Sequence, residues 1–287
     1  MVLTPGLKQR NAFQKAERSE TGRFRSVLLL KGELRMNEKL AALFACWEAP
    51  MVRASLQGVM GRVERWGEDS ALASIGDFCF LAGEPVRALV EQADAPILVP
   101  GSEGWARLIE DTLREGASPF TRYATRRPPE GFSRRRLLSF TEALPQGFCL
   151  HPIGREFYFT LMEEEWARDL CGCFDGEEDF LERGLGFVVT QGGGLPLAGA
   201  ASYAAYDGAI EIEIDTRPDF RRLGLASACG ARLILECLAR GIYPGWDAHD
   251  RRSLALAEKL GYQLDRPYTA YWVESKRRGY FLRESEN

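Results

Sequence analysis

The stretch at residues 209–226 reads AIEIEIDTRPDFRRLGLA. Residues 210–215 alternate an isoleucine with a carboxylate, and successive side chains of a strand point to opposite faces. One face is therefore expected to be buried and the other solvated. An apolar stripe with helical spacing then runs over residues 225–240, and a glycine, the residue that commonly ends a helix, follows. The stretch predicts a strand over 209–216, a turn and a long helix.

The turn between this strand and this helix has the chemistry of an anion site. A helix begins with backbone N–H groups that lack intrahelical partners, and its dipole adds positive potential there. Gly224 allows a close backbone approach, and Arg221 and Arg222 add cations that can clamp a phosphate. These features predict a phosphate cradle over Arg221–Ala226. The alternative is an ordinary strand-to-helix loop with solvated arginines.

The rest of the C-terminal half alternates strands and helices, and Asp207-Gly208 is typical of a hairpin turn. Further strands are expected at residues 148–153, 186–190, 197–206, 242–248, 262–264 and 269–275, and further helices at residues 156–170, 178–183 and 252–260.

The N-terminal half also predicts an α/β lobe. Helices are expected at residues 37–47, 51–63 and 105–113, and strands at residues 71–75, 78–81, 97–99 and 120–125. We divide the chain into a polar extension (1–33), an N-terminal α/β lobe (34–145) and a C-terminal domain (146–287). The triplet Arg134–Arg136 near the boundary is interpreted as a solvated helix face or linker rather than an anion-binding patch.

Composition and charge exclude several classes of protein. The formal net charge of -4 gives no general attraction to nucleic acid or to anionic membranes. No apolar run approaches the roughly 20 residues that cross a bilayer, and no secretory signal is visible, so we expect a cytoplasmic protein. Seven cysteines without a CxxC pair and two histidines predict neither a disulfide framework nor a metal site.

Two motifs resemble those of the GCN5-related N-acetyltransferases (GNAT). Residues 216–226 resemble the acetyl-CoA motif, with its slots at Arg221, Gly224 and Ala226. Residues 250–262 resemble the second motif, in which a helix opens on Asn-x-x-Ser and ends in Leu-Gly-Phe or Leu-Gly-Tyr. Here Asp stands where Asn is usual, although Asp can also cap a helix.

Two further blocks, residues 76–83 and 246–249, resemble the acetyltransferase family that includes the zwittermicin A resistance protein. The resemblance implies a mixed α/β sheet whose central strands separate after Thr216 and around Trp246. No Arg-x-x-Gly-x-Ala turn occurs between residues 81 and 97. We therefore interpret the N-terminal lobe as a degenerate GNAT-like copy without a cofactor, which covers the catalytic domain or completes its acceptor pocket. Asp77 is the polar residue of this lobe to test for substrate contact.

The resemblance also implies a function. We expect a monomeric or homodimeric enzyme that transfers acetyl from acetyl-CoA, without a metal, to a primary amine of a small molecule by direct attack. A protein or peptide amine is the alternative acceptor. The slot that often holds a tyrosine general acid is filled by Ala257, so another tyrosine (Tyr262, Tyr268 or Tyr271) protonates the thiolate, or coenzyme A leaves as thiolate. A third reading is an acyl-CoA-binding sensor without catalysis.

The candidate site residues follow from the strand and the two motifs. Glu213, Glu211 and His249 are the catalytic candidates, against the alternatives of surface carboxylates and a loop histidine. The expected cofactor-binding residues are Ile214, Asp215, Thr216, Arg221, Arg222, Leu223, Gly224, Leu225, Ala226, Asp250 and Ser253.

Overall fold

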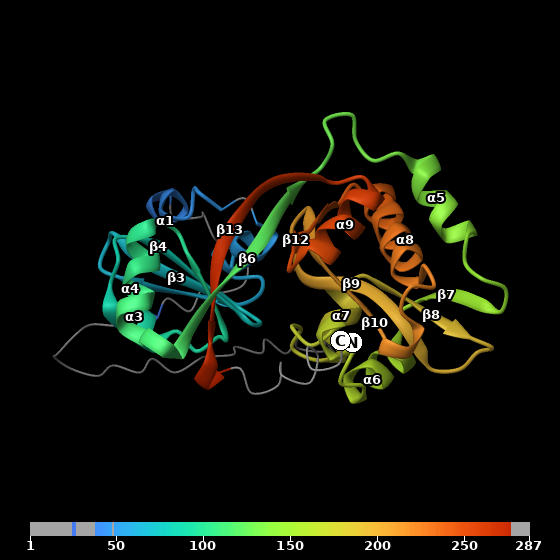
Figure 1. Ribbon diagram of the computed structural model, residues 1–287, viewed down its shortest axis with the longest axis horizontal. Coiled ribbons are helices and arrows are strands. Elements are labelled where there is room, and N and C mark those ends of the chain that lie inside the picture. Colours follow the sequence, from blue (N-terminus) through green and yellow to red (C-terminus); the bar gives the residue numbers. More distant parts are fainter. Residues whose placement is uncertain (1–24, 27–37, 48, 277–287) are drawn as a thin grey trace, which may run out of the picture.

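The structure is a computed structural model that describes residues 25–26, 38–47 and 49–276. Figure 1 shows two lobes, each built on a sheet, with two long strands reaching from one lobe toward the other. The predicted polar extension at residues 1–33 lies outside the described residues except for Arg25–Ser26, which form the short edge strand β1.

The elements of the N-terminal half alternate strands with helices, as expected for an α/β lobe. The strands are β2 (Arg62–Trp66), β3 (Ser70–Ile75), β4 (Phe78–Gly83), β5 (Ile97–Pro100) and β6 (Ala117–Arg126). The helices are α1 (Glu38–Leu43), α2 (Pro50–Leu56), α3 (Arg87–Gln92), α4 (Glu103–Leu113) and the short 3-10 turn η1 (Arg114–Gly116). Strands β4 and β5 pair in parallel across α3, whereas β2, β3 and β4 are antiparallel neighbours.

The C-terminal half supplies a second sheet. The strands of this half are β7 (Phe148–Pro152), β8 (Gly186–Gln191), β9 (Pro196–Tyr206), β10 (Ala209–Thr216), β11 (Tyr243–Gly245), β12 (Asp247–Ala248) and β13 (Gln263–Val273). The helices are α5 (Arg134–Glu142), α6 (Arg155–Glu163), η2 (Arg168–Leu170), α7 (Glu177–Arg183), η3 (Pro218–Phe220), α8 (Leu225–Arg240), α9 (Arg251–Leu260) and η4 (Glu274–Lys276). The five strands of the second sheet run in the order β11-β10-β9-β8-β7. Figure 1 shows α8 on one side of β9 and β10, and α6 and α7 on the other.

The last strands of the chain join the first lobe rather than the second. The sheet of that lobe runs β1-β2-β3-β4-β5-β13-β6-β12, so β12 and β13 lie in it although they follow α8 and α9 respectively. Strand β13 pairs antiparallel with β6 along nearly its whole length, and Figure 1 shows these two strands arching between the lobes. The division at residues 34–145 and 146–287 stays a prediction, but strands from its second part complete the sheet of its first.

The lobes are also packed against each other. Helix α2 contacts β9 and β10 of the second sheet, and one continuous cluster of buried apolar side chains includes residues from both lobes. The backbone N–H of Asp77 in the β3–β4 turn donates to the Tyr203 hydroxyl at 2.8 Å. Asp77 therefore lies at the junction of the lobes, and its predicted contact with substrate stays a prediction.

Several predicted elements are confirmed and others are wrong in extent. Strand β10 and helix α8 have the predicted bounds, and Ala209 pairs with Tyr206 across the predicted hairpin. The helix predicted over 51–63 is wrong beyond residue 56, because glycines at 58 and 61 adopt positive φ and the chain then enters β2. Helices α3 and α5 were not predicted. Arg134–Arg136 are exposed in the first turn of α5, which confirms the solvated helix face.

Three predictions were wrong about where a helix or strand is continuous. The single strand expected at 242–248 is two strands, β11 and β12, because each pairs in a different sheet. The two strands expected at 262–264 and 269–275 are one strand. Its Pro267 lies where β13 pairs only with β6, and proline is tolerated on such an edge. The helix expected at 156–170 is interrupted between α6 and η2.

No helix within the described ranges combines the length and the apolar character that a bilayer crossing requires.

Candidate active site

The site begins where two strands part. Strand β10 pairs in parallel with β11 only from Ala209 to Glu211. The next strand, β12, pairs with β6 of the other lobe instead. Beyond Glu211, no strand among the described residues pairs with this edge of β10, so the backbone of residues 212–216 borders an opening. The predicted separation of the central strands is thus present, but on β10 it starts after Glu211 and not after Thr216 as predicted.

A cleft of about 980 Å³ occupies this opening. Most of the residues expected to bind the cofactor line it. They are Ile214, Asp215, Thr216, Arg221, Arg222, Gly224, Leu225, Ala226, Asp250 and Ser253. Leu223 is 46% exposed and does not contribute to the lining. The tertiary structure therefore brings the two sequence motifs together, whereas their roles in binding stay predictions.

The start of α8 fits an anionic group. Gly224 has φ 82°, in the left-handed region, and no side chain caps the helix. Nothing lies within 4 Å of the position that a Cβ of Gly224 would occupy, so this face of the turn is open. Arg222 also adopts positive φ, at 64°. An uncapped helix start with an open approach and adjacent arginines is the geometry that binds phosphate.

Two cations that the sequence analysis did not single out reach the same region. Lys259 of α9 lines the cleft, and its Nζ donates to Ser227 Oγ in the first turn of α8 at 2.9 Å. Arg252 at the start of α9 also lines it. The position of Lys259 depends on how α9 packs against α8, which no local pattern shows.

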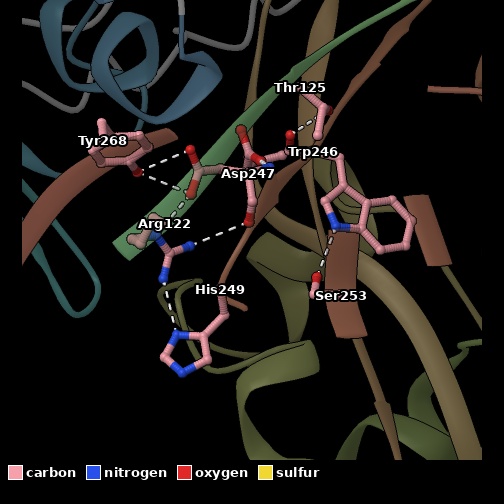
Figure 2. Close-up of polar contacts among 8 residues, drawn as sticks. Arg122, Thr125, Trp246, Asp247, His249, Ser253 and Tyr268 are labelled. Carbon is pink, nitrogen blue, oxygen red and sulfur yellow. Dashed lines mark hydrogen bonds and ion pairs between the residues drawn. The ribbon is translucent and has the colours of Figure 1, made fainter. Parts of the chain in front are cut away.

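The second motif forms a capped helix. The Oδ1 atom of Asp250 accepts from the Ser253 N–H at 2.8 Å, which confirms that Asp can cap α9 in place of Asn. The hydroxyl of Ser253 in turn accepts from the Trp246 indole at 3.1 Å (Figure 2). These contacts tie α9 to the β11–β12 segment on one wall of the cleft.

Glu211 lies at the point where the strands part. Its Oε1 accepts from the Asp247 N–H at 2.7 Å, just beyond the last residue pair of β10 and β11. Its Oε2 is buried and has no hydrogen-bond partner. Burial, and then the Asp247 carboxylate, raise the pKa of Glu211 to about 8, although the Asp247 N–H and Arg122 act in the opposite direction. Such a carboxyl can exchange a proton near neutral pH.

The prediction that Glu211 lies on a solvated face is wrong. Its residue is only 3% exposed, because the N-terminal lobe covers this part of β10. Glu213, two residues along the same face, is half-buried and lines the cleft as Glu211 does. Two-residue periodicity predicted the shared face, but not the lobe that covers it.

His249 also lines the cleft, and its ring is oriented by Arg122. The Nδ1 atom of His249 lies 3.2 Å from a terminal guanidinium nitrogen of Arg122 (Figure 2). Because a guanidinium only donates, this contact requires Nδ1 to accept. The ring also packs against Phe120 and Trp272. His249 is therefore held by the N-terminal lobe, and its predicted catalytic role stays a prediction.

Arg122 of β6 is the centre of a buried network that sequence reasoning missed. Its Nε donates to Asp247 Oδ1 at 2.7 Å, and the two side chains are 7% and 11% exposed. Tyr268 of β13 donates to the same carboxylate, with its hydroxyl 2.9 Å from both oxygens (Figure 2). Arg122 and Asp247 are 125 residues apart in the chain. The block at 246–249 drew attention to one partner, but nothing near residue 122 indicated the other.

The structure does not bring Tyr262 or Tyr271 to the cleft. The Tyr262 hydroxyl is buried and donates to the Pro244 carbonyl at 2.8 Å. The Tyr271 hydroxyl donates to Glu110 at 2.6 Å, beneath α4. Ala257 is fully buried. Tyr268 remains near the site, with its hydroxyl committed to Asp247.

Within the described ranges, no group of three or more His, Cys, Asp or Glu side chains could hold a metal ion.

Comparison with known proteins identifies similar sequences. A family model described as GNAT acetyltransferase matches residues 41–271. An uncharacterized N-acetyltransferase of Bacillus subtilis (strain 168), YdfB, is 28% identical over 184 residues, which are 61% of this chain and 65% of that protein. The match to that curated relative thus spans slightly less than two thirds of its length.

Solved structures are similar as well. The crystal structure of a GCN5-related N-acetyltransferase-like protein from Streptococcus suis 89/1591 superposes with a TM-score of 0.79 at 45% identity, covering 83% of this chain and 99% of that one. A tandem GNAT protein from the clavulanic acid biosynthesis pathway superposes with a TM-score of 0.50 at 11% identity, covering 87% and 98% of the two chains. The second likeness concerns the fold alone. The expected mixed α/β fold is confirmed.

Proposed function

Because the chain belongs to the GNAT acetyltransferase family, we propose that it transfers an acetyl group from acetyl-CoA to a primary amine of a small molecule. One observation carries the proposal: a single cleft joins the uncapped start of α8 to the buried carboxylate of Glu211. The start of α8 suits a pyrophosphate, and the Glu211 carboxylate suits proton removal. The blocks at 76–83 and 246–249 support a further proposal, that the chain belongs to the branch that includes the zwittermicin A resistance protein.

The donor binds along the open edge of β10. The N–H groups at the start of α8 and the side chains of Arg221 and Arg222 hold its pyrophosphate. Lys259 adds positive charge at the same end of the cleft. The edge of β10 that faces away from β9 at residues 212–216, where pairing with β11 has ended, receives the pantetheine arm as an added strand would be received. This arrangement directs the thioester toward Glu211.

The bound donor supplies an activated acetyl group. The amine nitrogen forms a bond to the acetyl carbon, and the bond from that carbon to sulfur breaks. Glu211 Oε2 takes the proton that the amine loses. The sulfur leaves as coenzyme A thiolate, because Ala257 provides no proton at the usual position. Glu213 and His249 line the space beside Glu211 and orient the acceptor.

Ala257 also motivates a second candidate function, an acyl-CoA-binding sensor without chemistry. The two functions differ in turnover and not in binding. Buried Glu211 with an unpartnered oxygen favours the enzyme, because a sensor has no need of a carboxyl whose pKa is raised toward neutrality.

Isothermal titration with acetyl-CoA, followed by a thiol-release assay over a panel of amines, tests the proposal. We expect saturable binding, and release of coenzyme A that depends on at least one small primary amine. Binding without release over the whole panel would favour the sensor. Release with a lysine-containing peptide but with no small amine would favour the alternative acceptor, a protein or peptide amine. No measurable affinity for acetyl-CoA would contradict all three readings.

A further inference from the structure

We propose that Arg122 is a positioning residue through which the N-terminal lobe sets the orientation of Glu211 in the cleft. The proposal rests on the function proposed above, in which Glu211 accepts the proton of the amine. It assigns the N-terminal lobe a direct part in the reaction, beyond covering the C-terminal sheet.

The first step concerns the hydrogen bonds of Arg122 to β12. Arg122 holds Asp247 twice, because Nε donates to the carboxylate at 2.7 Å and a terminal nitrogen donates to the Asp247 carbonyl at 3.2 Å. Its third contact is to His249 Nδ1 at 3.2 Å. Figure 2 shows the guanidinium between the carboxylate of Asp247 and the imidazole of His249. A planar guanidinium with several fixed donors can make these contacts at once, whereas a lysine ammonium on a flexible stem cannot.

The second step is the contact between β12 and Glu211. The N–H of Asp247 is the only hydrogen-bond donor to Glu211 Oε1 among the described residues, at 2.7 Å. Asp247 is therefore bound to Arg122 through its carboxylate and carbonyl, and to Glu211 through its N–H. Oε1 is fixed in this way, while the buried Oε2 has no hydrogen-bond partner. A displacement of Asp247 would be passed directly to the carboxylate.

The strand itself does not depend on Arg122. Backbone pairing joins Asp247 to Ala124 and Ala248 to Tyr123. The Thr125 hydroxyl also donates to the Trp246 carbonyl at 2.6 Å (Figure 2). Removal of the guanidinium therefore leaves β12 beside β6, changes the local position of Asp247 and removes the cation beside it. This is why a role in positioning can be separated from a role in folding.

The charges around Glu211 give the expected direction of the pH effect. The ionisable groups facing it are Arg122 on β6, Tyr206 on β9, Tyr243 on β11, Asp247 on β12 and Tyr262, which directly precedes β13. Arg122 is the only cation among them, and the tyrosines are neutral near pH 8. Loss of this cation leaves the carboxyl groups of Glu211 and Asp247 side by side without a compensating positive charge, which favours the protonated form of Glu211. The rising limb of the pH profile of activity should then move to higher pH.

The test compares Arg122→Met and Arg122→Lys with the wild type in the full chain. For Arg122→Met we expect kcat to fall by roughly 10- to 100-fold, as for other residues that orient a reacting group. The KM for acetyl-CoA should stay within about threefold, because the pyrophosphate end of the cleft is unchanged. The rising limb of the pH profile should shift upward. Arg122→Lys keeps the charge but not the geometry, so its limb should stay near the wild-type position while kcat falls.

Two controls separate positioning from stability. Arg107→Met removes an exposed arginine of the same lobe and should change neither kcat nor the pH limb. Tyr271→Phe removes a hydroxyl from β13 that donates to Glu110, away from the cleft, and it reports the effect of a lost hydrogen bond in that strand. Thermal melting of each variant shows that it is folded at the assay temperature.

The proposal is overturned when folded Arg122→Met retains the wild-type kcat and pH limb, or loses activity only in proportion to lost folded protein. If Arg122→Met does not fold, the comparison of kcat and pH limb is made between Arg122→Lys and the wild type. A folded Arg122→Lys with unchanged kcat then overturns the proposal as well. The proposed function fails differently, since the wild type would then release no coenzyme A, or Glu211→Gln would be as active as the wild type.

Discussion

Glu211→Gln is expected to lower kcat for acetyl transfer by about 100- to 10,000-fold, the range that a positioned general base contributes. Glutamine has nearly the same shape, and its side-chain oxygen can still accept from the Asp247 N–H as Oε1 does. It cannot accept a proton from the amine. The affinity for acetyl-CoA, measured by isothermal titration, should therefore stay within about threefold of the wild type. Steady-state thiol release gives kcat.

The pH profile of the wild type gives an independent measurement of the same residue. The pKa of Glu211 is raised to about 8, so the carboxyl is mostly protonated below that pH and mostly ionised above it. A base acts in its ionised form, so kcat/KM should rise as pH increases toward about 8 and level off above it. This limb should disappear in Glu211→Gln.

The exposed Glu103→Gln of α4 is the control for the loss of a carboxylate. It should keep both the rate and the limb. A Glu211→Gln enzyme with a wild-type rate would leave Glu211 as a structural residue that joins β10 to β12, and the base would then have to be sought at Glu213 or His249, which also line the cleft.

Gly224→Val is expected to weaken acetyl-CoA binding by about 100-fold or more, with the fold retained. Charge-assisted hydrogen bonds contribute about 1.5–3 kcal/mol each, and a side chain at this turn would displace the phosphate from at least two N–H groups. About 3 kcal/mol corresponds to slightly more than a hundredfold in affinity. The space into which the side chain would project is open, so no protein atom hinders it.

The control for this variant is Gly208→Val in the β9–β10 hairpin. Gly208 has φ 84°, close to the 82° of Gly224, and its Cβ position is equally free of neighbours. Both variants carry the strain of a left-handed β-branched residue, about 1–2 kcal/mol. Only Gly224→Val should lose affinity in isothermal titration. Equal loss in both variants would point to strain, and retained binding in Gly224→Val would contradict the phosphate cradle.

The parts of the site that could be predicted are those built by contiguous residues. The turn at 221–226 and the Asp250 cap of α9 depend on backbone conformations that a few neighbouring residues determine. The contact between Lys259 and Ser227 could not be predicted in this way, because it joins two helices through their packing. The extent of β13 was missed for a similar reason. Two strands were predicted, on either side of Pro267, whereas pairing with β6 continues a single strand through it.

The strand at residues 210–215 combines features that neighbouring residues determine with features that only tertiary packing determines. By itself the sequence determined that a strand forms here, that its carboxylates share one face, and that a turn and a long helix follow, because side-chain direction in a strand depends only on the backbone. Only the tertiary structure decided that Glu211 is buried, that the pairing of its strand with β11 ends at that residue, and that Arg122 fixes the neighbouring Asp247. No local pattern shows such contacts, because Arg122 is 125 residues from Asp247 in the chain, and burial within the folded protein is the main cause of the raised pKa of the Glu211 carboxyl.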